Sequence, residues 1–68
     1  MNNWHTVFKT TIQHQAEIVK AVLESSGLGA VVVNKKDSSY HWGLIEVKVN
    51  ADHVIKALKV IEDEIKFD

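Results

Sequence analysis

The stretch "LIEVKV", residues 44–49, alternates apolar and charged side chains and gives the clearest structural signal in the chain. Successive side chains of an extended strand point to opposite faces of its sheet. One face of this strand therefore receives the three apolar residues Ile45, Val47 and Val49. The other face receives Glu46 and Lys48. The stretch predicts a strand in a sheet that has one apolar face to cover and one polar face.

Two more strands are predicted from β-branched and aromatic composition. "WHTVFKT", Trp4–Thr10, forms the first strand, and "AVVVN", residues 30–34, forms the second. The alternation of the first strand is blurred because Val7 stands beside Phe8. Two phases are therefore open: Val7 points inward and leaves Trp4 and Phe8 as an exposed aromatic patch, or Phe8 lies in the core.

Two amphipathic helices are predicted between and after these strands. The first has an apolar stripe with steps of four and three, formed by Ile12, Ala16, Val19 and Leu23. Gly27 ends it, because glycine accepts the left-handed conformation of a helix C-cap. Asn50 or Asp52 can cap the second helix. Its stripe is formed by Val54, Leu58, Ile61 and Ile65.

The resulting order, β-α-β-β-α, predicts an α+β fold in which both helices cover one face of a three-stranded antiparallel sheet. The third strand lies between the first and the second, as in a truncated ferredoxin-like fold that lacks its last strand. With 68 residues, the chain has room for a single domain, residues 1–68, of marginal stability. The first strand has an unpaired edge that invites a second chain, so we expect a homo-oligomer.

Composition excludes several classes of protein. The chain has no cysteine, which favours a reducing cytoplasm over an oxidising compartment. Its longest apolar run, "GLGAVVV", is far shorter than the ~20 residues that a membrane helix needs. With a net charge of −1 and scattered lysines, the sequence predicts no basic patch for the phosphates of a nucleic acid. The stretch "LIEVKV" contains no aromatic side chain on which bases could stack.

The stretch "NKKDSSYHWG", residues 34–43, connects the second and third strands and is longer than a tight turn requires. Its short polar residues are typical of a plain hairpin connection. They also suit binding: lysines attract a phosphate or carboxylate, serines donate hydrogen bonds, and aromatic rings stack or anchor a protein. The binding candidates, for a protein partner or a small anionic ligand, are Lys35, Lys36, Asp37, Ser38, Ser39, Tyr40 and Trp42.

Neither catalysis nor a metal site is predicted. Asp37, Ser38, Ser39 and His41 are too close in sequence for a nucleophilic triad, whose members normally converge from separate parts of a fold. The four histidines form no i, i+4 pair and have no cysteine beside them. We therefore predict a non-enzymatic binding module without a cofactor. The alternatives are a small enzyme or metal-handling subunit and a nucleic-acid-binding domain.

The segments "AVLESSG", "NKKDSSY", "GLIEVKV" and "ADHVIKAL" together resemble a family of small bacterial domains of unknown function labelled putative signal-transducing proteins. This family is similar in fold to the nitrogen-regulatory PII superfamily. The resemblance implies a ferredoxin-like subunit that oligomerises and contacts partner proteins through the connection between its second and third strands. The connection is shorter here than in PII, and no nucleotide-binding motif is present. ATP and 2-oxoglutarate are therefore not implied.

Overall fold

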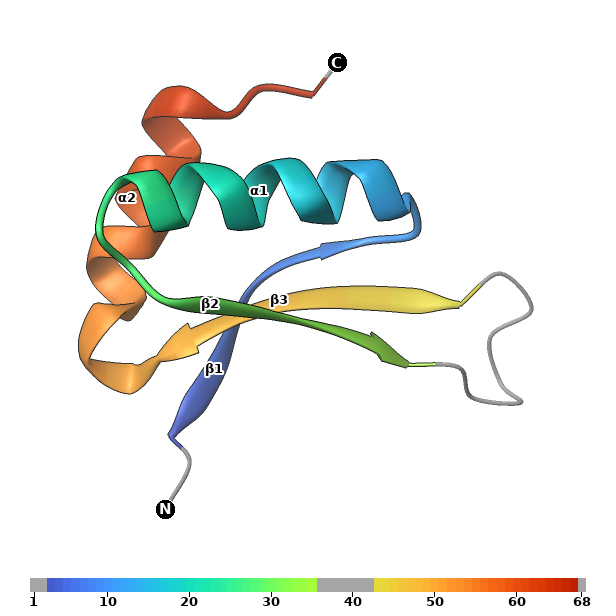
Figure 1. The fold of residues 1–68 in the computed structure, drawn as a ribbon, viewed down its shortest axis with the longest axis horizontal. Coiled ribbons are helices and arrows are strands. Elements are labelled where there is room, and N and C mark those ends of the chain that lie inside the picture. Colours follow the sequence, from blue (N-terminus) through green and yellow to red (C-terminus); the bar gives the residue numbers. More distant parts are fainter. Residues whose placement is uncertain (1–2, 36–42, 68) are drawn as a thin grey trace.

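A computed structural model describes residues 3–35 and 43–67 of the chain (Figure 1). Its elements follow the predicted order, with one short 3-10 helix, η1, added before the last helix. They are β1 (Trp4–Thr10), α1 (Gln13–Ser25), β2 (Ala30–Lys35), β3 (Leu44–Asn50), η1 (Ala51–His53) and α2 (Val54–Glu64).

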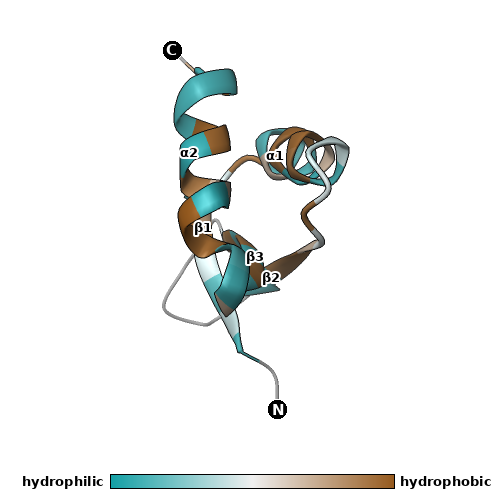
Figure 2. Ribbon diagram, turned by 90° about the vertical axis from the view of Figure 1, so that its left-hand side faces the viewer, coloured by the Kyte–Doolittle hydropathy of each residue, from teal (hydrophilic) through white to brown (hydrophobic). Residues whose placement is uncertain are grey.

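The three strands form one antiparallel sheet in the order β1-β3-β2, with both helices layered on the same side of it (Figure 1). Figure 2, which looks along α1, shows α1 above β2 and α2 beside β1. The α+β, truncated ferredoxin-like fold predicted from the sequence is confirmed. β3 is the central strand: its backbone pairs with β1 on one side and β2 on the other, and its alternation turns one apolar face to the helices.

The hydrophobic core lies between the sheet and the helices. The apolar face of β3 supplies three of its members. α1 supplies Leu23, the largest of the fully buried side chains. α2 contributes one fully buried residue, Ala57, and packs the partly buried Val54, Val60 and Ile61 against the core. The buried set is Ala16, Val19, Leu23, Leu28, Ala30, Ile45, Val47, Val49 and Ala57.

A β-bulge in β1 decides which way its aromatic residues point. The register places Thr6 opposite Lys48 and then Phe8 opposite Val47, so Val7 is an extra residue in the ladder. Paired residues share a face of the sheet. Phe8 therefore packs against the core, while Trp4 lies on the other face. Of the two phases that the sequence left open, the one with Phe8 in the core agrees with the structure. The exposed patch of Trp4 and Phe8 together does not form, because a one-residue insertion reverses the alternation.

Gly27 ends α1 as predicted. Its φ of 85° is left-handed, and the N–H of Gly27 donates to the carbonyl of Glu24 at 3.0 Å. The N–H of Leu28 donates to the carbonyl of Leu23, also at 3.0 Å. These two bonds are the Schellman pattern, and the two leucines that it brings together are both buried.

Two residues of the predicted helical stripes do not face the core. Ile12 stands just before α1 and is 51% exposed, because its extended backbone precedes the first helical turn. Leu58 is 47% exposed, because α2 turns Ala57 toward the sheet instead. Of the two predicted caps, Asn50 is used: its side chain accepts the N–H of Asp52 at 3.0 Å, at the start of η1.

Candidate functional site

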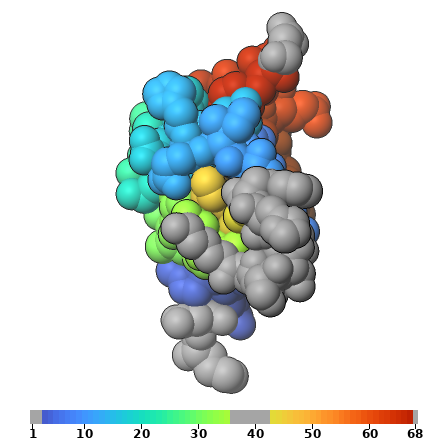
Figure 3. Space-filling model, turned by 90° about the vertical axis from the view of Figure 1, so that its right-hand side faces the viewer, coloured from blue at the N-terminus to red at the C-terminus, as the bar shows by residue number. Residues whose placement is uncertain are grey.

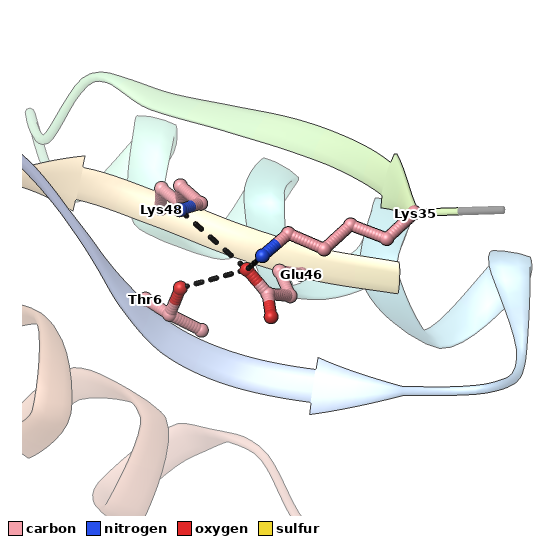
Figure 4. Close-up of polar contacts among 4 residues, drawn as sticks. All are labelled: Thr6, Lys35, Glu46 and Lys48. Atoms are coloured by element: carbon pink, nitrogen blue, oxygen red, sulfur yellow. Dashed lines mark hydrogen bonds and ion pairs between the residues drawn. The ribbon is translucent and has the colours of Figure 1, made fainter. Parts of the chain in front are cut away.

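The candidate site lies on the face of the sheet opposite the helices, which we call the open face. Alternation along β3 puts Glu46 and Lys48 there, because Ile45, Val47 and Val49 occupy the core face. The neighbouring strands add Thr6 from β1 and Lys35 from β2, each diagonally opposite Glu46 in the register. Four polar side chains from three strands therefore meet at one point (Figure 4).

A single carboxylate oxygen organises this cluster. The hydroxyl of Thr6 donates to Oε1 of Glu46 at 3.0 Å. The ammonium groups of Lys35 and Lys48 each lie 3.5 Å from the same Oε1 (Figure 4). The Glu46 side chain is only 6% exposed, whereas half of the Lys35 side chain reaches solvent. The arrangement is a buried anion held beneath two cations that remain partly in water.

The environment of Glu46 keeps it charged. Burial by itself raises the pKa of a carboxyl group, because it disfavours the ionised form. The hydrogen bond from Thr6 and the charges of Lys35 and Lys48 act in the opposite direction and prevail. The pKa of Glu46 is therefore lowered from its ordinary value of 4.5. A carboxylate in this state holds its neighbours in place but is poorly suited to exchange protons near neutral pH.

Apolar side chains surround the charged cluster on the open face. Trp4 is 36% exposed and Val31 is 37% exposed, and both register positions belong to this face. Val33 and Leu44 lie there half-buried. Exposed aromatic rings such as that of Trp4 are enriched at protein interfaces.

The binding residues predicted from the sequence and the Glu46 cluster have one member in common, Lys35. Lys35 is the last residue of β2 and is held by Glu46. The other candidates, Lys36, Asp37, Ser38, Ser39, Tyr40 and Trp42, lie outside the residues that the structure describes. Their role stays a prediction.

Sequence reasoning missed the importance of Glu46, Thr6 and Lys48. The alternation of "LIEVKV" assigned Glu46 and Lys48 to the polar face, where side chains are normally solvated. It gave no sign that a threonine and a lysine from other strands enclose the carboxylate. The signal in the sequence was that Glu46 and Lys48, which carry opposite charges, stand two residues apart on one face of the strand.

In the described part of the chain, residues 3–35 and 43–67, no helix is long and apolar enough to span a bilayer. Over the same residues, no group of three or more histidine, aspartate or glutamate side chains is placed to hold a metal ion.

The fold and the open face define a small α+β domain with a truncated ferredoxin-like sheet, one surface of which is left uncovered by the described residues. The chain belongs to the family described as "putative prokaryotic signal transducing protein", which it matches over residues 4–65. No curated protein and no solved structure matches the chain. The family match is therefore the link between this fold and a biological role.

Proposed function

We propose that this chain is a non-enzymatic regulatory module that binds a protein partner on the open face of its sheet. The observation that carries the proposal is the fixed cluster of Glu46, Lys35 and Lys48 beside the exposed Trp4 and Val31. The family description, which names signal transduction, supports a role in binding over a role in chemistry. The lowered pKa of Glu46 agrees with this, because the carboxylate serves as a structural anion.

The charges of the open face indicate what the partner presents. Lys9 stands opposite Glu46 in the register, so it joins Lys35 and Lys48 on this face. Among the described residues of this face, three lysines thus accompany one carboxylate, that of Glu46. A partner surface that combines an apolar contact for Trp4 with one or two carboxylates complements this arrangement. Binding should weaken as salt is added, because salt screens the attraction between partly exposed lysines and the partner's carboxylates.

Lys35 links the open face to the segment that the sequence singled out. It is the last residue of β2, and the chain continues from it into residues 36–42. We propose that this segment also contributes to binding, so that a partner contacts both it and the open face. We also propose that the protein acts in the cytoplasm as a homo-oligomer, supported by its cysteine-free composition and by the free sheet edges considered below.

The test is capture of partners by the immobilised full chain, followed by affinity measurement with each purified candidate. Trp4→Ala and Lys35→Ala should each weaken the interaction at least about tenfold, the usual scale for a hot-spot residue. Lys56→Ala is the matched control, since Lys56 is exposed on α2 away from the sheet. The control should bind like the parent chain.

Two results would overturn the proposal. One is a purified partner that binds the Trp4→Ala and Lys35→Ala variants as tightly as the parent. The other is a thermal-shift screen of phosphates and organic acids in which a small anion stabilises the parent but not Lys35→Ala, with no protein bound. That result would establish the small-ligand alternative.

A further inference from the structure

The outer edge of β2 carries little of the usual protection against pairing: its one charged residue is Lys35, at the very end of the strand. Among the described residues, no strand pairs with β2 on the side away from β3. Its register with β3 is continuous from Ala30 to Lys35, without a bulge. Residues 30–34 are uncharged, contain three consecutive valines and lack proline. A regular, β-branched, uncharged edge is a template for another strand.

The outer edge of β1 differs in the regularity of its strand. Its ladder is broken by the bulge between Thr6 and Phe8. It also carries an exposed cation, Lys9. Bulges and lysines are the devices by which natural sheets discourage pairing at an edge. The sequence pointed to the edge of β1, but the local geometry makes β2 the better candidate.

A row of polar side chains on α1 lies beside the free edge of β2. Gln13, Glu17 and Lys20 line an open hollow together with residues 30–32. Glu24 continues the row, because Lys20 and Glu24 form an ion pair at 3.7 Å. Gln13 donates to Glu17 at 3.1 Å. Figure 3 shows α1 and β2 on the same side of the molecule.

The order of this row is self-complementary. α1 runs antiparallel to β2 (Figure 1), so a twofold axis that pairs β2 with a second β2 also sets two α1 helices antiparallel. Centred between residues 18 and 19, such an axis brings Glu17 opposite the partner's Lys20. It also brings Gln13 opposite the partner's Glu24. The charged pair of Glu17 and Lys20 then occurs twice across the axis, with opposite charges facing each other.

We infer that a second copy of this chain docks along β2, so that the two sheets join as one six-stranded sheet. The hollow beside β2 supports this arrangement, because it lies between the free strand edge and the charged row of α1. The inference rests on the self-association proposed above and names its surface: the edge of β2 and the row Gln13, Glu17, Lys20 and Glu24. The open face stays accessible on both copies, since strand pairing extends a sheet sideways.

The experiment measures the mass of the full chain by light scattering and sedimentation across the micromolar range. The parent should reach twice its chain mass. Glu17→Lys and Lys20→Glu should each weaken dimerisation at least about tenfold, because like charges then face each other across the axis. The double variant Glu17→Lys/Lys20→Glu restores opposite pairing and should dimerise like the parent. An equimolar mixture of the two single variants should form a heterodimer.

Lys56→Glu on the exposed side of α2 is the matched control, with the same charge change as Lys20→Glu, and should leave dimerisation unchanged. Circular dichroism checks that each variant folds. Amide exchange of residues 30–34 should slow as the concentration rises, whereas exchange along β1 should not.

Three outcomes would contradict the inference in distinguishable ways. A parent chain that stays monomeric refutes self-association itself, including the oligomer proposed above. A dimer that tolerates both single charge reversals refutes only the β2 surface and leaves oligomerisation standing. If dimerisation slows amide exchange along β1 and not in residues 30–34, the interface lies at the other edge of the sheet.

Discussion

Replacing Glu46 with glutamine tests whether the charged cluster stabilises the fold. The amide oxygen of Glu46→Gln can still accept the hydroxyl of Thr6, so the variant removes the charge and keeps the shape. A hydrogen bond to a charged group contributes about twice as much as a neutral one, so weakening this one costs about 1 kcal/mol. The two lysine contacts at 3.5 Å are partly exposed and add about 0–1 kcal/mol in total.

The free energy of unfolding at neutral pH should therefore fall by about 1–2 kcal/mol, which lowers the melting temperature of a domain this small by about 5–15 °C. Urea and thermal denaturation measure both quantities. Glu24→Gln is the control: Glu24 pairs with Lys20 at 3.7 Å on the surface of α1, where such pairs contribute about 0.3–0.5 kcal/mol. Its effect should be no larger than that.

The dependence on pH follows from the lowered pKa of Glu46. A carboxyl group whose pKa is lower in the folded state stabilises the fold above its unfolded pKa. This contribution is lost as the pH falls through the folded pKa, below the ordinary value of 4.5. The stability difference between the parent and Glu46→Gln should therefore be largest at neutral pH and shrink under acid conditions.

A Thr6→Val/Glu46→Gln double-mutant cycle isolates the part of the hydrogen bond at 3.0 Å that depends on the charge of Glu46. The coupling between the two substitutions should be about 1 kcal/mol at neutral pH. Our account of the cluster fails if Glu46→Gln is as stable as the parent, or if its deficit is the same at neutral and acid pH. In either case the buried carboxylate would contribute nothing through its charge.

Three further substitutions, and Gly29→Ala as a control, test the fold. Gly27→Ala should lower the free energy of unfolding by about 1–2 kcal/mol in urea denaturation because of its φ of 85°, whereas Gly29→Ala meets no atom within 4 Å and should be neutral or slightly stabilising. Phe67→Ala removes a ring whose centroid lies 5.9 Å from that of Phe8; it should cost at least about 0.5–1.5 kcal/mol, and equal stability would show that the segment after α2 does not pack. Leu23→Ala should cost about 3–5 kcal/mol by thermal denaturation because its side chain is fully buried.

The sequence by itself determined the elements, their order and the topology of the sheet. Alternation in "LIEVKV" predicted the face that the helices cover, because a period of two places all three apolar residues on the same side of the sheet. The β-α-β-β-α order predicted the central position of β3. The stop at Gly27 was equally local, since a left-handed residue is needed wherever a helix ends in this way. Signals of this kind are contained within a few neighbouring residues.

Tertiary structure decided the rest. The bulge that separates Trp4 from Phe8 arises from pairing with β3, which no pattern within β1 reveals. The Glu46 cluster needs side chains that are 40 positions apart, as Thr6 and Glu46 are, to meet across neighbouring strands. The difference between a protected β1 edge and an open β2 edge also depends on register. Each of these features comes from distant segments that folding brings together. Local patterns in a single sequence do not show which distant segments will be in contact.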